Sequence, residues 1–202
     1  MIKENTELKT AIEFFNQNNL IVFPCKDKKP KIKWRDIEEQ DLDELNELFN
    51  DDDELAIRTG NGIIVIDIDI KGDDGKEGFR SFDKLQAELG ELPKTLTSQT
   101  RSGGQHRYFR LPEDIEIGNA TNLKRLVGVD VRSTGGYVIA PPTKDYKFTQ
   151  VQSLTMLPKK WYDGIKTTTP TTTSNVINMD LVNEDGKIID NRDDKASKII
   201  FA

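Results

Sequence analysis

The sequence predicts a mixed α+β fold, or an α/β unit joined to an antiparallel sheet, and three observations support this prediction. Several segments have apolar residues at helical spacing, whereas short runs rich in Ile, Val, Tyr and Phe have the composition of strands. Turn signals such as Asn-Gly and Gly-Gly separate many of these strands. The two kinds of segment do not alternate strictly, as they would in a doubly wound parallel sheet.

Four segments are predicted to be helices because apolar residues recur in them every three or four positions. The predicted helices span residues 8–20, 41–49, 79–90 and 157–165. The run "NQNN" ends the first helix, and Gly90 ends the third as a C-terminal cap.

The predicted strands are short and lie between these helices. They span residues 21–25, 55–58, 63–70, 95–100, 105–111, 127–133, 137–141 and 146–151. Pro24 is expected to stop the first strand, after which residues 26–34 form a basic loop. The run 63–70, "IIVIDIDI", is expected to be a central strand, and 146–151 an edge strand.

Composition restricts the class of protein. The chain is 35% hydrophobic and 32% charged, with a net charge of −6, which is typical of a soluble globular protein. The negative balance argues against a surface coated with basic side chains, although a local basic groove remains compatible with it. No apolar run approaches the roughly 20 residues that cross a membrane. Cys25 is the single cysteine, so no internal disulfide forms, and a cytoplasmic location is expected.

The chain is expected to divide into three parts. Residues 1–165 hold the helices and strands and should form the catalytic domain proposed below. Residues 166–175 are rich in Thr and contain no apolar side chain, which predicts a flexible linker. Residues 176–202 are too few and too polar for a core of their own, and are interpreted as a tail or as the start of a missing C-terminal region.

Two carboxylates lie inside the most apolar strand. On a strand, residues i and i+2 point to the same side, so Asp67 and Asp69 share a face. Such close carboxylates repel each other unless a cation lies between them, and Mg²⁺ or Mn²⁺ prefers oxygen ligands. The alternative is a strand end that leaves the core, with both Asp residues solvated or paired with Lys71.

A second strand repeats this arrangement. The run "GVDVRS" puts Asp130 and Arg132 on one face and valines on the other. Three carboxylates on adjacent strands would form a site for one or two metal ions, as in enzymes that transfer phosphoryl or nucleotidyl groups. A surface ion pair between Asp130 and Arg132 is the alternative.

The third feature is the run "TRSGGQHRYFR". Ser102, Gly103 and Gly104 form a small turn whose backbone amides are suited to an anion. His106, the single histidine, follows on the next strand, and a histidine beside such a turn suits a triphosphate. The alternative is an ordinary hairpin turn followed by a half-exposed histidine.

Taken in order, these three features resemble the catalytic core of the archaeo-eukaryotic primase superfamily. The chain is most similar to the bifunctional primase-polymerase (prim-pol) domains of plasmids, phages and other mobile elements. The runs "KKPKIKW", "AIRTGNGIIVIDID" and "VDVRSTGGYVIAPPT" also resemble that family, and the similarity covers roughly residues 12–148.

The resemblance implies a fold and an activity. The fold is a primase-like α+β arrangement, with an RRM-like catalytic sheet, helices and an additional N-terminal αβ unit. The activity is template-dependent nucleotidyl transfer from NTP or dNTP by a DNA primase/polymerase, in the replication of a mobile element or phage. The implied partners are single-stranded DNA template, primer, NTP or dNTP, and a replicative helicase, fused in a longer parent or separate.

The resemblance also implies roles for individual residues. Asp67, Asp69 and Asp130 would hold Mg²⁺ or Mn²⁺, and His106 would contact the phosphates of the incoming nucleotide. The remaining implied nucleotide contacts are Arg58, Ser102, Gly103, Gly104 and Arg132. The implied template contacts are Lys29, Lys31 and Arg107.

Two other classes of function remain open at this point. A metal-dependent nuclease would use the same carboxylates and would cleave nucleic acid without nucleoside triphosphates. A non-catalytic single-stranded DNA or origin-binding module would bind through aromatic side chains exposed on its sheet. The aromatic residues Tyr108, Phe109 and Tyr137 are instead expected in the core.

Overall fold

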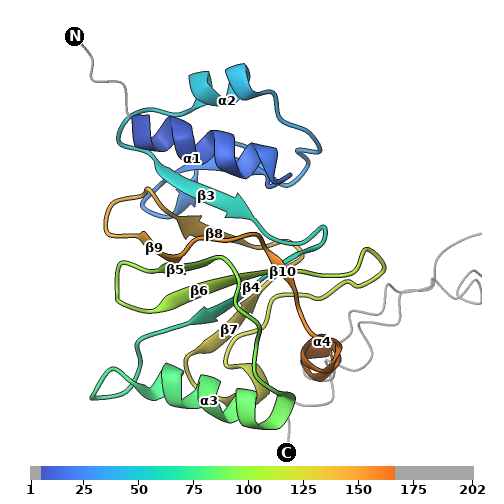
Figure 1. Ribbon diagram of the computed structural model, residues 1–202. Helices are drawn as coiled ribbons and strands as arrows, with labels where there is room; N and C mark the ends of the chain where they lie inside the picture. Colours follow the sequence, from blue (N-terminus) through green and yellow to red (C-terminus); the bar gives the residue numbers. More distant parts are fainter. Residues whose placement is uncertain (1–5, 167–202) are drawn as a thin grey trace, which may run out of the picture. The chain divides into compact units, whose positions relative to one another are not determined.

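The computed structural model describes residues 6–166, and these form a mixed α+β fold with two mainly antiparallel sheets (Figure 1). The helices are α1 (Thr6–Gln17), α2 (Leu42–Leu48), α3 (Glu77–Leu89) and α4 (Lys159–Lys166), with a short 3₁₀ turn at Leu123–Arg125. The strands are β1 (Val22–Lys26), β2 (Lys29–Pro30), β3 (Glu54–Arg58), β4 (Ile63–Ile68), β5 (Thr97–Gln99), β6 (Gln105–Arg110), β7 (Val129–Arg132), β8 (Tyr137–Ala140), β9 (Lys147–Gln150) and β10 (Thr155–Met156). The predicted fold class and all four predicted helices are therefore confirmed.

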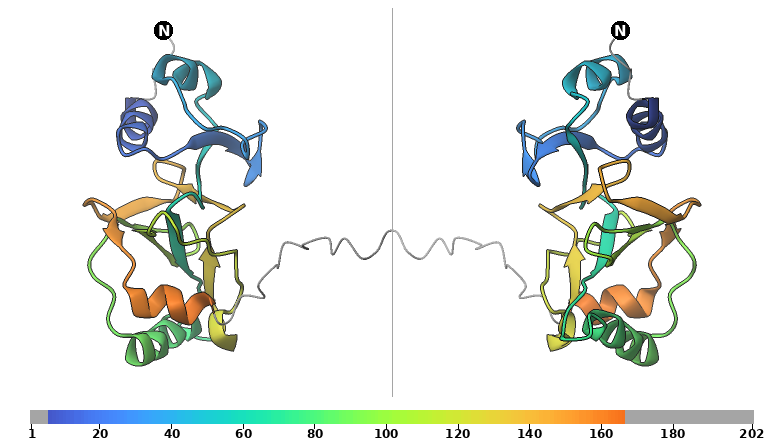
Figure 2. Two further views of the ribbon diagram at one scale, coloured as in Figure 1. Left: turned by 90° about the vertical axis from the view of Figure 1, so that its right-hand side faces the viewer. Right: turned by 90° about the vertical axis from the view of Figure 1, so that its left-hand side faces the viewer.

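The strands form two sheets. The first has the order β2-β1-β3-β8, and the second has the order β7-β4-β6-β5-β9, with β10 pairing in parallel with β6. Figure 1 and the two turned views in Figure 2 show α1 and α2 beside the first sheet and α3 and α4 beside the second. The predicted edge strand is confirmed as β9, whereas β10 and the 3₁₀ turn were not predicted.

Strand β4 is buried on both faces. Ile64, Ile66 and Ile68 belong to a core with α3 and α4, whereas Ile63 and Val65 belong to a core with α1 and α2. A strand covered on both faces needs apolar residues at nearly every position, which explains the continuous run in the sequence. β4 is thus the central strand that the sequence predicts.

Pro24 does not stop β1, which corrects the prediction. The strand continues to Lys26, and the Pro24 carbonyl accepts a hydrogen bond of 3.0 Å from the amide of Lys31. In a strand, the amide and carbonyl of one residue point to the same side, so the missing N–H of Pro24 faces β2 rather than β3. Because that missing N–H points away from β3, the proline removes no hydrogen bond between β1 and β3.

The predicted basic loop contains a tight hairpin. Lys26 pairs with Lys29, so Asp27 and Lys28 are the two central residues of the turn between β1 and β2. Their φ angles are 48° and 61°, as a type I′ turn requires. The expected loop over residues 26–34 is therefore wrong at its start, where β1 and β2 pair.

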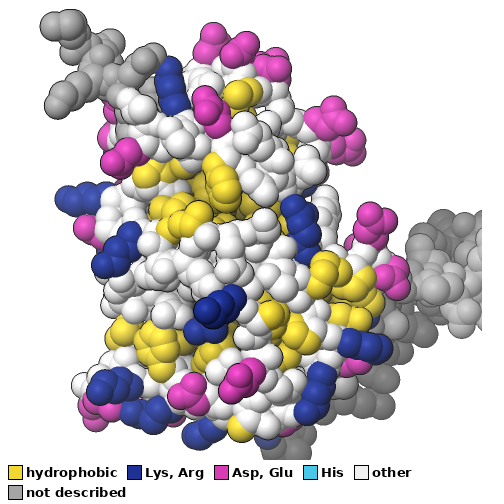
Figure 3. Space-filling model, in the orientation of Figure 1, with side chains coloured by type: hydrophobic (Ala, Val, Ile, Leu, Met, Phe, Trp, Pro, Cys, Tyr) yellow, Lys and Arg dark blue, Asp and Glu magenta, His cyan; other side chains and the backbone are white. Residues whose placement is uncertain are grey.

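The acidic balance of the chain has a structural location. Figure 3 shows acidic side chains gathered around α2, which contains Asp43, Glu44 and Glu47. Asp41 caps this helix by accepting hydrogen bonds from the amides of its first turn. These acidic side chains thus lie beside the first sheet and not over the second.

The division of the chain into three parts stays a prediction. α4 extends to Lys166, one residue into the predicted linker. The rest of that linker and residues 176–202 lie outside the described residues. No helix in the described range is long and apolar enough to cross a membrane.

Ile66→Ala should lower the free energy of unfolding by about 2–5 kcal/mol, because Ile66 is fully buried in the middle of β4 and a cavity would remain. Val127→Ala is the control, since Val127 is 48% exposed and its truncation should change stability by less than about 0.5 kcal/mol. Urea denaturation monitored by tryptophan fluorescence measures both. Equal stability of the two variants would contradict the central position of β4.

Candidate active site

Three predicted residues lie side by side across three neighbouring strands. Asp67 of β4 is directly opposite His106 of β6 on one side and directly opposite Asp130 of β7 on the other. All three are buried, with exposed fractions of 6–8%. The strand order β7-β4-β6 therefore brings together groups that are far apart in the sequence.

The two facing carboxylates have unequal partners. Asp130 accepts hydrogen bonds from Arg132 at 2.8 Å and from the Asn122 amide at 2.9 Å. Asp67 lies 3.7 Å from the Arg132 guanidinium and 3.5 Å from His106 Nε2, and its Oδ1 has no hydrogen-bond partner among the described residues. A buried carboxylate oxygen without a partner is costly, and such an exception calls for an explanation.

The pKa of Asp67 is raised to about 7, and burial is the largest cause of this shift. The nearby charges of Asp69 and Asp130 also raise it, whereas the charges of Arg132 and Lys28 oppose the shift. The three acidic groups are therefore close enough to repel one another. This is the electrostatic condition that a divalent cation relieves.

Burial has the opposite effect on His106 and lowers its pKa to about 4. A hydrogen bond with the Ile139 backbone opposes this shift, and the charges of Arg132 and Lys28 add to it. The imidazole is thus neutral near pH 7, with one ring nitrogen as a donor. Its Nδ1 lies 3.5 Å from the Tyr108 hydroxyl, and the Tyr146 ring lies beside it with centroids 6.2 Å apart.

Asp69 lies just beyond the end of β4, because the strand ends at Ile68 rather than at Ile70 as predicted. Its amide donates a hydrogen bond of 2.8 Å to the Gly128 carbonyl. Its carboxylate is partly exposed, and Lys71 Nζ lies 3.9 Å away. This part of the alternative interpretation, a strand end with Asp69 next to Lys71, matches the structure for Asp69 but not for buried Asp67.

Glycines allow the backbone to approach Asp69 closely. A Cβ on Gly78 would lie 2.1 Å from the Asp69 carbonyl oxygen, and a Cβ on Gly104 would lie 2.3 Å from that of Ile68. Neither position has room for a side chain. Gly104, predicted as an anion-binding residue, therefore also has a packing reason to be glycine.

A cavity of about 400 Å³ opens between the two sheets over Asp67 and His106, whereas Asp130 and Asp69 do not line it. Its lining combines charged and aromatic side chains: Lys28, Asp67, His106, Arg132, Tyr137 and Tyr146. Sequence reasoning assigned no role to Lys28, Tyr137 or Tyr146 in a site. The signal for Lys28 was its place in the basic loop, but the neighbouring lysines carried the same signal.

The predicted turn does not line this cavity. The Gly103 amide already donates a hydrogen bond of 2.9 Å to the Thr100 carbonyl, and the Ser102 hydroxyl lies 3.1 Å from that of Thr100. These groups are used within the turn itself. The structure therefore does not bring Ser102, Gly103 or Gly104 together with Asp67 and His106 in one pocket.

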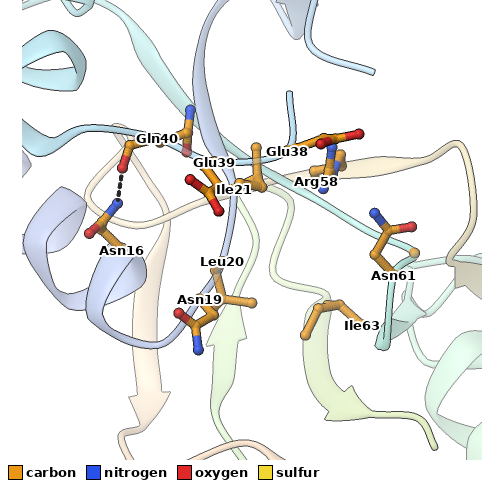
Figure 4. Close-up of a pocket in the computed structure, with 11 residues that line it drawn as sticks. Asn16, Asn19, Leu20, Ile21, Glu38, Glu39, Gln40, Arg58, Asn61 and Ile63 are labelled. Atoms are coloured by element: carbon orange, nitrogen blue, oxygen red, sulfur yellow. Dashed lines mark hydrogen bonds between the residues drawn. The ribbon is translucent and has the colours of Figure 1, made fainter. Parts of the chain in front are cut away.

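Arg58 lies in a different cavity, shown in Figure 4. Its guanidinium donates hydrogen bonds to the carbonyls of Arg35 and Ile37, and Glu38 and Glu39 line the same cavity. The structure separates Arg58 from the other residues predicted to bind nucleotide.

The three predicted template contacts have different surroundings. Lys31 forms an ion pair of 2.6 Å with Asp53, and the Arg107 guanidinium lies over the Phe82 ring at 4.5 Å. Lys29 is exposed on β2. These residues do not form one continuous surface through contacts with one another.

The carboxylates as they stand do not form a finished metal site. Within residues 6–166, no group of three or more His, Cys, Asp or Glu side chains is arranged to hold a metal ion. Two features still fit a hard divalent cation: the donors are carboxylate oxygens, and Asp67 Oδ1 is buried without a partner. Both oxygens of Asp130 already accept hydrogen bonds, one from Arg132 and one from the Asn122 amide.

Asp67 and His106 should give the protein opposing dependences of stability on pH. With its pKa raised from 3.8 to about 7, Asp67 retains in the folded state a proton that the unfolded state loses, so stability falls as pH rises through this window. The pKa of His106 is lowered from 6.5 to about 4, so between these pH values the unfolded state binds a proton that the folded state does not. The contribution of His106 to stability therefore rises between pH 4 and 6.5.

Asp67→Asn removes the titrating carboxyl group of Asp67, and with it the fall in stability as pH rises towards 7. The free energy of unfolding of this variant should rise by on the order of 3 kcal/mol between pH 4 and 6.5, more than in the wild type. Urea titrations at several pH values measure this, and Asp114→Asn, at an exposed position, should follow the wild type. A variant profile as flat as that of the wild type would contradict the assignment.

Comparisons with known proteins complete the description of the site. No curated protein matches the chain. The model of the family described as the N-terminal domain of bifunctional DNA primase/polymerases matches residues 11–160, a range that includes both sheets and every residue of the cavity. The match covers well over half of the chain, and the chain therefore belongs to this family of DNA primase/polymerases, which in broad terms assigns it a primase/polymerase function in DNA replication.

Proposed function

We propose that the protein is a template-dependent nucleotidyltransferase that extends a primer on single-stranded DNA with NTP or dNTP. The observation that carries the proposal is the alignment of Asp130, Asp67 and His106 across β7, β4 and β6, with Asp67 and His106 lining one cavity. In a member of the primase/polymerase family, this is where the reacting groups would meet. The mobile-element context and a helicase partner remain predictions from the resemblance.

Asp67, Asp69 and Asp130 would hold Mg²⁺ or Mn²⁺ through their carboxylate oxygens. When bound, such an ion neutralises phosphate charge and lowers the pKa of an attacking hydroxyl. The three carboxylates supply the negative charge that would attract the ion. Without the ion, Arg132 balances the charges of Asp67 and Asp130.

The reaction joins the primer 3′-hydroxyl oxygen to the α-phosphorus of the nucleotide, and the bond from that phosphorus to the bridging oxygen breaks to release pyrophosphate. His106 is neutral and would donate one N–H to a phosphate oxygen. This hydrogen bond would stabilise the negative charge of the phosphate in the transition state. Arg132, once released from Asp130, pairs with phosphate as a planar donor. Catalysis rests on positioning and electrostatics, and needs no covalent bond to the protein.

Asp67→Asn and Asp130→Asn should each lower primer extension at least a hundredfold, because each removes a charge from the place where the phosphates would react. The measurement uses a labelled primer on a longer template with dNTPs or NTPs. Asp114→Asn, whose side chain is exposed, is the matched control and should retain wild-type extension. Primer shortening without nucleotides would instead favour a nuclease, and DNA binding without extension would favour a binding module.

Divalent cations should be required for extension. Chelation with EDTA should abolish the reaction, and excess Mg²⁺ or Mn²⁺ should restore it, because without the ion the carboxylates repel the triphosphate. Extension that continues unchanged in EDTA, after dialysis against the chelator, would exclude the proposed role of the carboxylates.

A further inference from the structure

Lys28 is the one residue of the cavity that comes from the N-terminal hairpin. It occupies the second central position of the turn between β1 and β2, and it lines the same cavity as Asp67, His106 and Arg132. Its charge acts on both Asp67 and His106, as one of the smaller influences on their pKa values. The turn therefore places a cation over the candidate site.

The backbone at Lys28 is strained. Its φ of 61° lies in the left-handed region, where Gly or Asn is the usual residue of a type I′ turn. A lysine there costs stability relative to glycine. Strain of this kind persists where surrounding contacts fix the backbone, and it gathers at functional sites.

Two side chains fix the Lys28 backbone. The amide donates a hydrogen bond to Glu54 Oε2, and the carbonyl accepts one of 2.8 Å from the Tyr137 hydroxyl. Glu54 is buried, and its other oxygen pairs with Arg101 at 3.1 Å. The position of Lys28 is therefore set by contacts with β3 and β8, and β8 lines the cavity.

The charge of Lys28 is available for a ligand. Two neighbouring lysines of the same hairpin are neutralised, Lys26 by Asp52 at 2.5 Å and Lys31 by Asp53 at 2.6 Å. Among residues 6–166, no carboxylate lies within ion-pair distance of the Lys28 ammonium. Lys26 and Lys31 are thus paired, whereas neither Lys28 nor Lys29 has an ion pair among residues 6–166, and of these two only Lys28 lines the cavity.

We propose that Lys28 binds a phosphate group of the incoming nucleotide. The inference rests on the proposed function and adds a binding residue to it. An ammonium on a flexible stem is a compact donor that suits a phosphate oxygen. Together with Arg132 it would place cations at two sides of the cavity, where a triphosphate would have several negative charges to balance.

Two variants separate binding from folding. Lys28→Met removes the charge and keeps the length of the side chain. Lys28→Gly removes the charge and relieves the strained φ, so its melting temperature should equal or exceed that of the wild type. Lys33→Met is the control, since Lys33 is an exposed lysine of the same segment that does not line the cavity.

Affinity for labelled dATP is measured at equilibrium with Mg²⁺ and without DNA, followed by competition with inorganic triphosphate. Both Lys28 variants should bind dATP and triphosphate at least tenfold more weakly, as expected when one charge-assisted hydrogen bond is lost, and Lys33→Met should stay within twofold of the wild type. Binding of single-stranded DNA, measured without nucleotide, should be unchanged in all three.

Other results would overturn the inference. Wild-type dATP affinity in both Lys28 variants, with primer extension intact in the wild type, would refute the role of Lys28 and leave the proposed function standing. Loss of DNA binding alone would assign Lys28 to the phosphates of DNA instead. If the wild-type protein bound no dATP and extended no primer, the proposed function would fail, and the role of Lys28 with it.

Discussion

The rest of the site depends on two buried carboxylates that face each other across β4 and β7. Like charges directly opposite in a sheet destabilise it, and burial adds a cost of desolvation. Asp67 and Asp130 are tolerated because Arg132, two residues along β7, reaches both, and because the Asn122 amide binds Asp130. One oxygen of Asp67 nevertheless has no hydrogen-bond partner among the described residues, although His106 Nε2 lies 3.5 Å from it. Proteins that bury charged groups at a cost to stability generally do so at functional sites.

The sequence placed Asp67 and Asp130 on strands, because the pattern that indicates a strand is local. The acidic residues within apolar runs identified Asp67 and Asp130 as members of strands, and both lie in strands, β4 and β7. The helices were found for the same reason. The strand order β7-β4-β6, which makes Asp67 the neighbour of both Asp130 and His106, has no local signal in the sequence and was not predicted.

The walls of the cavity could not be predicted in this way. Gly135 and Gly136 suggest a simple turn between two strands, yet β7 and β8 belong to different sheets, so Tyr137 faces the site from the opposite side. Lys28 and its neighbouring lysines look alike in the sequence, and only their partners Asp52 and Asp53 distinguish them. Arg58, which the resemblance implied as a nucleotide contact, lies in a separate cavity.

The hydrogen bond between Tyr137 and Lys28 joins residues 109 positions apart, and this has a consequence for motion. The floor of the cavity is a central strand buried on both faces, whereas its rim is a hairpin whose second strand has two residues. Short, exposed segments open locally at far lower free energy than buried strands. Amide hydrogens of the hairpin would therefore exchange with solvent long before those of β4. One cavity is thus bounded by a rigid strand, β4, and by a hairpin that opens locally. A large substrate could enter without any unfolding of the central sheet.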